Sequence, residues 1–109
     1  PFGPDELAVL RAHLPGARVV YGKSWGSTRH YGDPDAARLS LAGLRDWKVD
    51  GRTMARTAQA LFMHCLPVRR NLKVADEVLD APTSAVLDQA RARLDVQKAT
   101  LCRAFGVSP

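Results

Sequence analysis

The sequence is poor in cysteine and aromatic residues and lacks any long apolar run. Its two cysteines, Cys65 and Cys102, form no C-x-x-C pair, and no histidine falls at a metal-ligand spacing with them. We therefore expect neither a disulfide nor a bound metal, and reduced thiols favour the cytoplasm. No apolar run approaches the ~20 residues that cross a bilayer, which predicts a protein without membrane contact. The opening at Pro1, without methionine or a signal pattern, indicates a segment of a longer chain.

Acidic residues are outnumbered, with 16 lysines and arginines against 11 aspartates and glutamates and a net charge of +5. Such an excess is compatible with nucleic-acid binding. However, the basic residues are dispersed, with acidic residues between many of them, and aromatic residues amount to only 6%. A stacking platform for bases needs aromatic side chains interleaved with a basic stripe. We therefore expect no nucleic-acid partner, and an anionic small-molecule ligand accounts for part of the charge.

Helical and strand patterns alternate along the chain. Pro4 and two acidic residues begin a predicted helix that Pro15-Gly16 ends, and Asp50 caps a short helix running to about Ala58. A third helix is predicted over about 88–105, short buried strands over 17–21, 60–64 and 84–87, and a polar loop with one helical turn over 68–80. Residues 22–40 have no periodicity and are rich in Gly, Ser, Asp and Pro, so we expect a long functional loop there.

This order of elements predicts an α/β fold. A chain of 109 residues fits one domain, and the alternation of helices and strands matches half of a doubly wound parallel sheet. Because both faces of a parallel sheet need cover, three short strands indicate that further strands lie upstream. We predict the C-terminal half of a Rossmann-like, three-layer domain, with the apolar side chains of Val19, Val20, Leu61 and Phe62 poorly covered.

The tetrapeptide His64-Cys65-Leu66-Pro67 follows the second predicted strand directly. It places an imidazole, a thiol and a constrained Leu-Pro peptide at the carboxyl end of that strand. In open α/β sheets, ligands bind outside the carboxyl ends of the strands. The tetrapeptide therefore marks the expected substrate site.

Three stretches resemble the aspartate/ornithine carbamoyltransferase family, and within it the N-acetylornithine and N-succinylornithine branch. They are Val19-Val-Tyr-Gly-Lys-Ser-Trp-Gly26, Phe62-Met-His-Cys-Leu-Pro-Val-Arg-Arg-Asn-Leu-Lys73 with its continuation to Leu79, and the helix from Asp88 to Leu101. The resemblance implies that residues 1–109 are the C-terminal part of the ornithine-type, second-substrate domain, without the N-terminal carbamoyl-phosphate domain. It implies a cytoplasmic homotrimeric enzyme of arginine biosynthesis without a cofactor, whose substrates are carbamoyl phosphate and N-acyl-ornithine or ornithine.

The resemblance also assigns roles to individual residues. Lys23 would bind the α-carboxylate of the acylated ornithine, and Cys65 and Leu66 would face both substrates through their backbone carbonyls. Arg93 would donate to the carbamoyl oxygen or the phosphate, a task suited to a permanently charged guanidinium. Lys73 aligns with a lysine near the acyl pocket that can be carried as a carbamate, which requires a neutral amine and hence a lowered pKa.

Other parts of the pattern qualify these assignments. The family usually reads Asp-Glu-Ala-Glu-Asn-Arg where this chain has Asp88-Gln-Ala-Arg-Ala-Arg93, which changes the setting of Arg93. We interpret His64 as a neighbour that fixes the loop, and Trp25 and Trp47 as packing residues. The resemblance implies a cis peptide between Leu66 and Pro67.

The sequence leaves two questions open. One is whether the chain belongs to a working enzyme or is a non-catalytic binding module derived from the same fold. The other is whether the second substrate is N-acetylornithine, N-succinylornithine or free ornithine, because the discriminating residue is expected in the missing domain.

Overall fold

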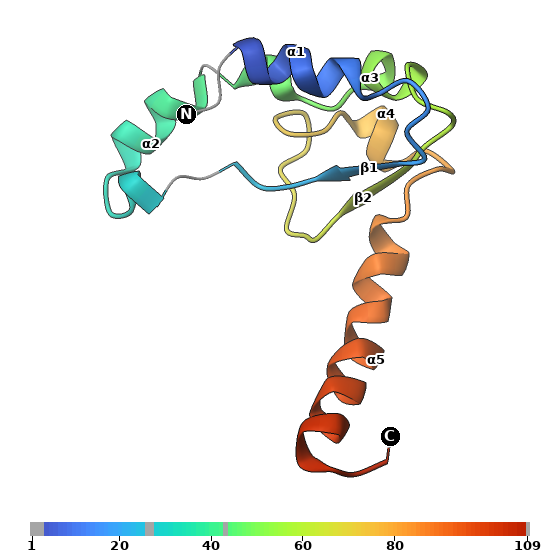
Figure 1. Ribbon diagram of the computed structural model, residues 1–109. Coiled ribbons are helices and arrows are strands. Elements are labelled where there is room, and N and C mark those ends of the chain that lie inside the picture. The colour runs from blue at the N-terminus through green and yellow to red at the C-terminus, as the bar shows by residue number, and fades with distance from the viewer. Residues whose placement is uncertain (1–3, 26–27, 43, 109) are drawn as a thin grey trace.

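The computed structural model describes residues 4–25, 28–42 and 44–108. The helices and strands follow each other in the order α1 Pro4–Ala12, β1 Val19–Gly22, η1 Thr28–His30, α2 Pro34–Ala42, η2 Arg45–Trp47, α3 Gly51–Ala55, β2 Leu61–His64, α4 Asp76–Leu79 and α5 Val86–Phe105. The predicted alternation of helices and strands is confirmed, and the fold is α/β (Figure 1).

Strands β1 and β2 pair in parallel, with Val19 opposite Leu61 and Gly22 opposite His64. The third predicted strand, at residues 84–87, is wrong in extent, because it reduces to one bridge between Phe62 and Ser84. The amide of Phe62 donates to the carbonyl of Thr83 at 2.9 Å, and the amide of Ala85 donates to the carbonyl of Phe62 at 2.8 Å. At Val86 the chain already turns into α5, so no further ladder forms.

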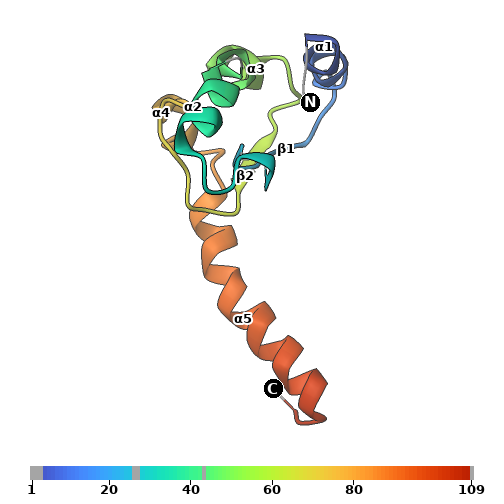
Figure 2. The ribbon, with the colours of Figure 1, turned by 90° about the vertical axis from the view of Figure 1, so that its left-hand side faces the viewer.

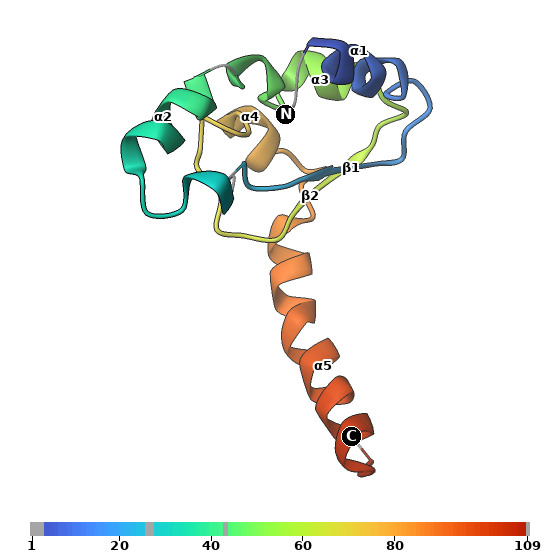
Figure 3. The ribbon, with the colours of Figure 1, turned by 60° about the vertical axis from the view of Figure 1, so that its left-hand side comes forward.

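Helices cover the strands from two sides. Helices α1 and α3 lie on one side of β1 and β2, and α5 leaves from the other side (Figure 1 and Figure 3). Helix α5 projects away from the rest of the molecule, as Figure 2 also shows. Residues 91–101 of this helix are all exposed. This layering is that of a Rossmann-like domain, but only the first turns of α5 are covered.

The core is small and centred on β2. Phe62, which we expected to be poorly covered, is completely buried, and it packs with Val74, Val78 and Val86. By contrast, Val19 and Leu61 remain 49% and 46% exposed. The Cα radius of gyration is 16.7 Å, whereas a compact domain of this length has about 13 Å. The chain therefore adopts an open shape with little buried interior.

The segment 22–40 is more regular than predicted, since it contains η1 and the first part of α2. Asp33 caps α2: its Oδ1 accepts from the amide of Ala36 at 3.0 Å, and its carbonyl accepts from the amide of Ala37 at 3.0 Å. Pro34 occupies the first helical position, where a missing amide proton costs nothing. Residues typical of loops thus begin a helix here.

The residues predicted to begin and end the other helices do so, although the helix ends shift by a few residues. Oδ1 of Asp50 accepts from the amide of Thr53 at 2.9 Å and caps α3, which ends at Ala55 rather than near Ala58. Gly106 ends α5 in the left-handed conformation, with φ of 67°. Among the described residues, no helix has the length and apolar character that a bilayer crossing requires.

Candidate functional site

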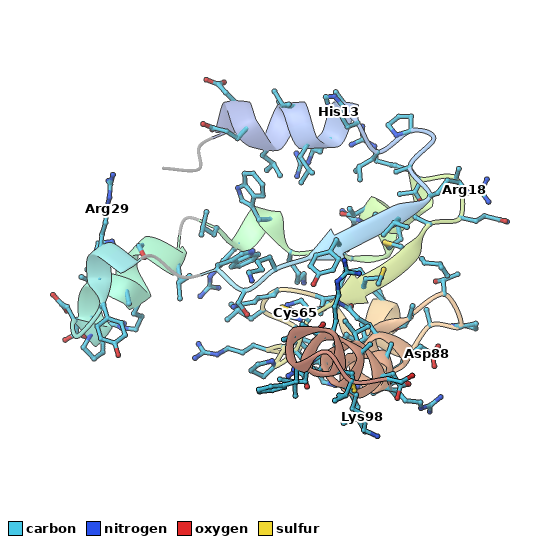
Figure 4. All side chains as sticks on the ribbon, turned by 60° about the horizontal axis from the view of Figure 1, so that its bottom comes forward. His13, Arg18, Arg29, Cys65, Asp88 and Lys98 are labelled. Atoms are coloured by element: carbon cyan, nitrogen blue, oxygen red, sulfur yellow. The ribbon has the colours of Figure 1, made fainter. Side chains whose placement is uncertain are left out.

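The predicted site residues gather where β1 and β2 end. In the register of the two strands, Gly22 lies beside His64, so Lys23 and Cys65 follow from neighbouring strand ends. Figure 4 shows Cys65 and Arg18 at opposite ends of the strand pair, and Arg29 on the distant segment that carries η1. The peptide between Leu66 and Pro67 is cis, as predicted. The loop that the sequence predicts to bind substrate therefore begins at the carboxyl edge of the sheet.

His64 is the best-defined polar group of this edge. Its ring is only 1% exposed, and Nδ1 accepts a hydrogen bond from the amide of Leu66 at 3.0 Å. Nδ1 therefore carries no proton, and Nε2 carries the one of the neutral ring. Burial, together with the positive charges of Lys73 and Lys23, lowers the pKa of His64. Nε2 is buried without a partner among the described residues, so its donor is left unsatisfied.

Lys73 is buried beside this ring, with 9% of its surface exposed. Burial and the nearby charge of Arg69 lower the pKa of its ammonium group. Its backbone is held firmly, because its carbonyl accepts from the amide of Val49 at 2.9 Å and its amide donates to the carbonyl of Arg69 at 3.2 Å. The lowered pKa shifts Lys73 toward the neutral amine, which is the direction that carbamate formation requires.

Cys65 and Leu66 form the turn between β2 and the Pro67 loop. Cys65 is a half-buried free thiol. Leu66 packs on the core and has a φ of 50°. Non-glycine residues seldom adopt this left-handed conformation, and such local strain is concentrated at ligand-binding sites. The turn is therefore held in the kind of conformation expected at a binding loop.

A network of charges fixes the loop that carries Lys73, and sequence reasoning missed it. The guanidinium of Arg70 donates to Oδ1 of Asp76 at 2.7 Å and to both carboxylate oxygens of Asp80 at 2.7 and 2.9 Å. Asn71, with φ of 58°, donates to Asp76 through Nδ2 at 2.6 Å and accepts the amide of Asp76 at 3.1 Å. The Arg-Arg-Asn element, followed closely by two aspartates, could have indicated these ion pairs from the sequence. These contacts lower the pKa values of Asp76 and Asp80, chiefly through the hydrogen bonds from Arg70.

Arg93 is not joined to the other candidate residues. It lies on the exposed stretch of α5, and its guanidinium makes no hydrogen bond or ion pair with any described residue. The start of α5 is tied to β1 instead by Gln89, whose Nε2 donates to the hydroxyl of Tyr21 at 3.0 Å. Gln89 stands in the altered segment before Arg93, so this bond joins that segment to β1.

A broad open cleft of about 1020 Å³ lies beside β1. Lys23 and the half-buried Trp25 and Trp47 line it, together with apolar residues of α1 and β1. Cys65, Leu66 and Lys73 are not among the described residues that line it. No group of three His, Cys, Asp or Glu side chains within the described ranges is placed to hold a metal ion.

Parallel strands covered by helices on both sides, with His64-Cys65-Leu66-Pro67 at the end of β2, form an α/β domain of the Rossmann-like type. The family model for the aspartate/ornithine carbamoyltransferase Asp/Orn binding domain matches residues 7–104. The chain belongs to this family.

Relatives and solved structures agree with this assignment. The N-acetylornithine carbamoyltransferase of Xanthomonas campestris is 42% identical over 93 residues, which are 85% of this chain and 27% of the relative. The N-succinylornithine carbamoyltransferase of Bacteroides thetaiotaomicron is 45% identical over 78 residues, 72% of this chain and 23% of the relative. The crystal structure of acetylornithine transcarbamylase complexed with acetylcitrulline superposes with a TM-score of 0.74 at 39% identity, covering 86% of this chain and 28% of that one. The chain thus spans about a quarter of the length of the relatives it matches.

Proposed function

We propose that this chain supplies the second-substrate half of a carbamoyltransferase active site, one that carbamoylates the side-chain amine of an N-acyl-ornithine. The loop His64-Cys65-Leu66-Pro67 carries the proposal, because it stands at the carboxyl edge of the sheet between Lys23 and the buried Lys73. Relatives named for N-acetyl- and N-succinylornithine support the acylated substrate. The intact protein would be a cytoplasmic homotrimer of arginine biosynthesis.

In the reaction, the neutral amine attacks the carbonyl carbon of carbamoyl phosphate. A carbon–nitrogen bond forms, the bond between the carbonyl carbon and the phosphate oxygen breaks, and the amine gives up a proton. The backbone carbonyls of Cys65 and Leu66 would accept hydrogen bonds from the attacking amine and the carbamoyl amide. Lys23 would pair with the α-carboxylate, and Arg93 would stabilise the charge growing on the carbonyl oxygen or phosphate.

The buried lysine gives this site a second chemical property. With its pKa lowered, Lys73 has a neutral fraction that can attack carbon dioxide, forming a carbamate and releasing one proton. The resulting anion would be compensated by the nearby charge of Arg69, and Nε2 of His64 is a buried donor without a partner among the described residues. Carbon-13 NMR in labelled bicarbonate tests this directly. We expect a carbamate signal that Lys73→Arg removes and Lys98→Arg, on the exposed face of α5, leaves in place.

The function is tested in a chimera that joins the N-terminal part of the Xanthomonas campestris relative to this chain. We expect the chimera to form the carbamoylated product from N-acetylornithine or N-succinylornithine faster than from ornithine. A folded chimera that binds the acylated ornithine without turnover would instead identify a non-catalytic binding module. Preference for free ornithine would refute the acylated substrate while leaving the reaction class intact.

A further inference from the structure

A second polar cleft, of about 450 Å³, lies between α1 and α3. Figure 3 shows both helices on the same side of the strands, and Nη2 of Arg56, the residue directly after α3, donates to the carbonyl of Arg11 on α1 at 3.3 Å. None of the proposed substrate-binding residues lines this cleft. Its basic lining comes from three separate segments and consists of Arg11, Arg45, Lys48, Arg52 and Arg56.

Asp50 is the single acidic side chain among the described residues that line the cleft, and it already accepts hydrogen bonds from within the protein. Its Oδ1 accepts from both the amide and the hydroxyl of Thr53 at 2.9 Å. Burial alone would raise the pKa of Asp50, but these bonds and the charges of Arg52 and Lys48 outweigh it, so the pKa is lowered. Asp50 therefore stays ionised as a helix cap and offsets only one of the five positive charges.

In the part of the chain that the structure describes, the positive charges of the cleft form no ion pair. Within the described residues, the ion pairs join Arg38, Arg70 and Arg91 to nearby aspartates, and none includes a cation of the cleft. Like charges around a concave surface raise the local potential and attract anions. Guanidinium groups match the oxygens of phosphate in a two-point geometry. An excess of four charges exceeds what one phosphate group would neutralise.

We propose that this basic cleft binds a polyphosphate anion, either inorganic or carried by a nucleotide. None of the residues lining the cleft is aromatic, so the cleft offers no surface on which a base would stack. Recognition therefore rests on the phosphate chain. This distinguishes the cleft from a single-stranded nucleic-acid surface, and it separates the proposal from the carbamoyl transfer at the sheet edge.

Titration calorimetry with sodium tripolyphosphate tests the proposal on the chimera described above, with carbamoyl phosphate present in saturating amount to occupy the phosphate site of the N-terminal part. We expect saturable binding of one anion per chain. Arg45→Gln and Arg52→Gln should each raise the dissociation constant ~10-fold or more, as expected for loss of a charge-assisted bond. Arg103→Gln, an exposed change of the same charge on α5, should leave it unaltered. Circular dichroism of each variant verifies that the fold is retained.

Further ligands identify what is bound. Equal affinity for tripolyphosphate and ATP, with weak binding of orthophosphate, would support recognition of the phosphate chain. Three results would overturn the proposal: no saturable binding, equal weakening by Arg103→Gln, or preferential binding of an RNA oligonucleotide that also depends on Arg103. The last two would indicate a general effect of the net charge or a nucleic-acid surface.

Discussion

The amide of Leu66 donates a hydrogen bond to Nδ1 of His64 at 3.0 Å, so the turn after β2 holds its own histidine in one neutral tautomer. Protonating the ring would break this bond and add a positive charge beside Lys73 and Lys23. The substrate loop and the protonation state of His64 are therefore linked.

We expect the stability of the chain to fall as the pH is lowered from about 7 to about 5. The pKa of His64 lies below its ordinary 6.5 in the folded state. The unfolded chain therefore binds more protons in this range, and acid favours unfolding. Urea unfolding at several pH values measures the effect.

His64→Asn keeps an acceptor for the amide of Leu66 but cannot titrate, so it should flatten this pH dependence. His13→Asn, on the exposed end of α1, is the matched control and should not. An unchanged slope in His64→Asn would show that another group is responsible.

We expect Gly22→Ala to destabilise the fold. A Cβ added at Gly22 would lie 3.0 Å from Cζ of Phe62 and 3.1 Å from Cδ2 of His64, both in buried rings. Overpacking of this kind costs about 1–3 kcal/mol. Phe62→Leu creates room at the same place, so the double variant should lose less stability than the sum of the two single changes. Additive losses in denaturant unfolding would contradict this explanation.

Arg70→Lys should lower the melting temperature by a few degrees and loosen the loop that holds Lys73. Lysine cannot grip both oxygens of Asp80 and reach Asp76 at once, as the guanidinium does. Arg91→Lys is the control, since Arg91 makes one exposed contact of 3.5 Å with Asp88. Hydrogen exchange of the amides of Asn71 and Asp76 reports the loosening directly, and equal exchange in both variants would refute the role of Arg70.

The strands could be predicted from the sequence because each is a short apolar segment bounded by turn residues. The same reasoning failed at Pro34 and Asp35, where residues typical of loops begin α2. It also extended the third strand into Val86, because an apolar β-branched residue fits the start of a buried helix equally well. Local sequence cannot decide such cases, which depend on what packs against the segment.

The motif predicts which residues form the site, but it does not predict what surrounds them in the fold. The backbone of Lys73 is held by Val49, which is distant in sequence: the amide of Val49 donates to the carbonyl of Lys73, and its carbonyl accepts from the amide of Ala75. The ion pairs of Arg70 with Asp76 and Asp80 likewise form only when α4 packs beside the loop that carries Arg70. Spacing alone indicates neither contact, because both are made by the tertiary fold.

In the intact enzyme, we expect Lys23→Ala to weaken binding of the acylated ornithine and Arg93→Ala to slow carbamoyl transfer. The carboxylate that Lys23 would hold is unchanged during the reaction, so its loss raises KM with little change in kcat. Arg93 would meet charge that grows in the transition state, so its loss lowers kcat. Steady-state kinetics of the chimera separates the two effects. Unchanged turnover in Arg93→Ala would show that Gln89 and the altered segment after it direct this arginine elsewhere.

Finally, we expect the isolated 109-residue chain to lack carbamoyltransferase activity and to be marginally folded. No described strand pairs with the second edge of β1, whose Val19 and Tyr21 are about half exposed. Helix α5 presents a stripe of exposed Leu87, Leu94, Leu101 and Phe105. Open strand edges and apolar stripes promote association, and no domain holds carbamoyl phosphate against Arg93, so the advantage of proximity is lost.

Sedimentation, thermal unfolding and product assays with both acylated ornithines measure these properties. We expect concentration-dependent association, a broad unfolding transition and no product above the uncatalysed rate. Replacing Leu94 and Leu101 with glutamine should reduce association without restoring activity, because it removes apolar surface but adds no phosphate site. Turnover by a compact monomer would show that residues 1–109 contain a complete active site. The proposal that this chain supplies only the second-substrate half of the site would then be wrong.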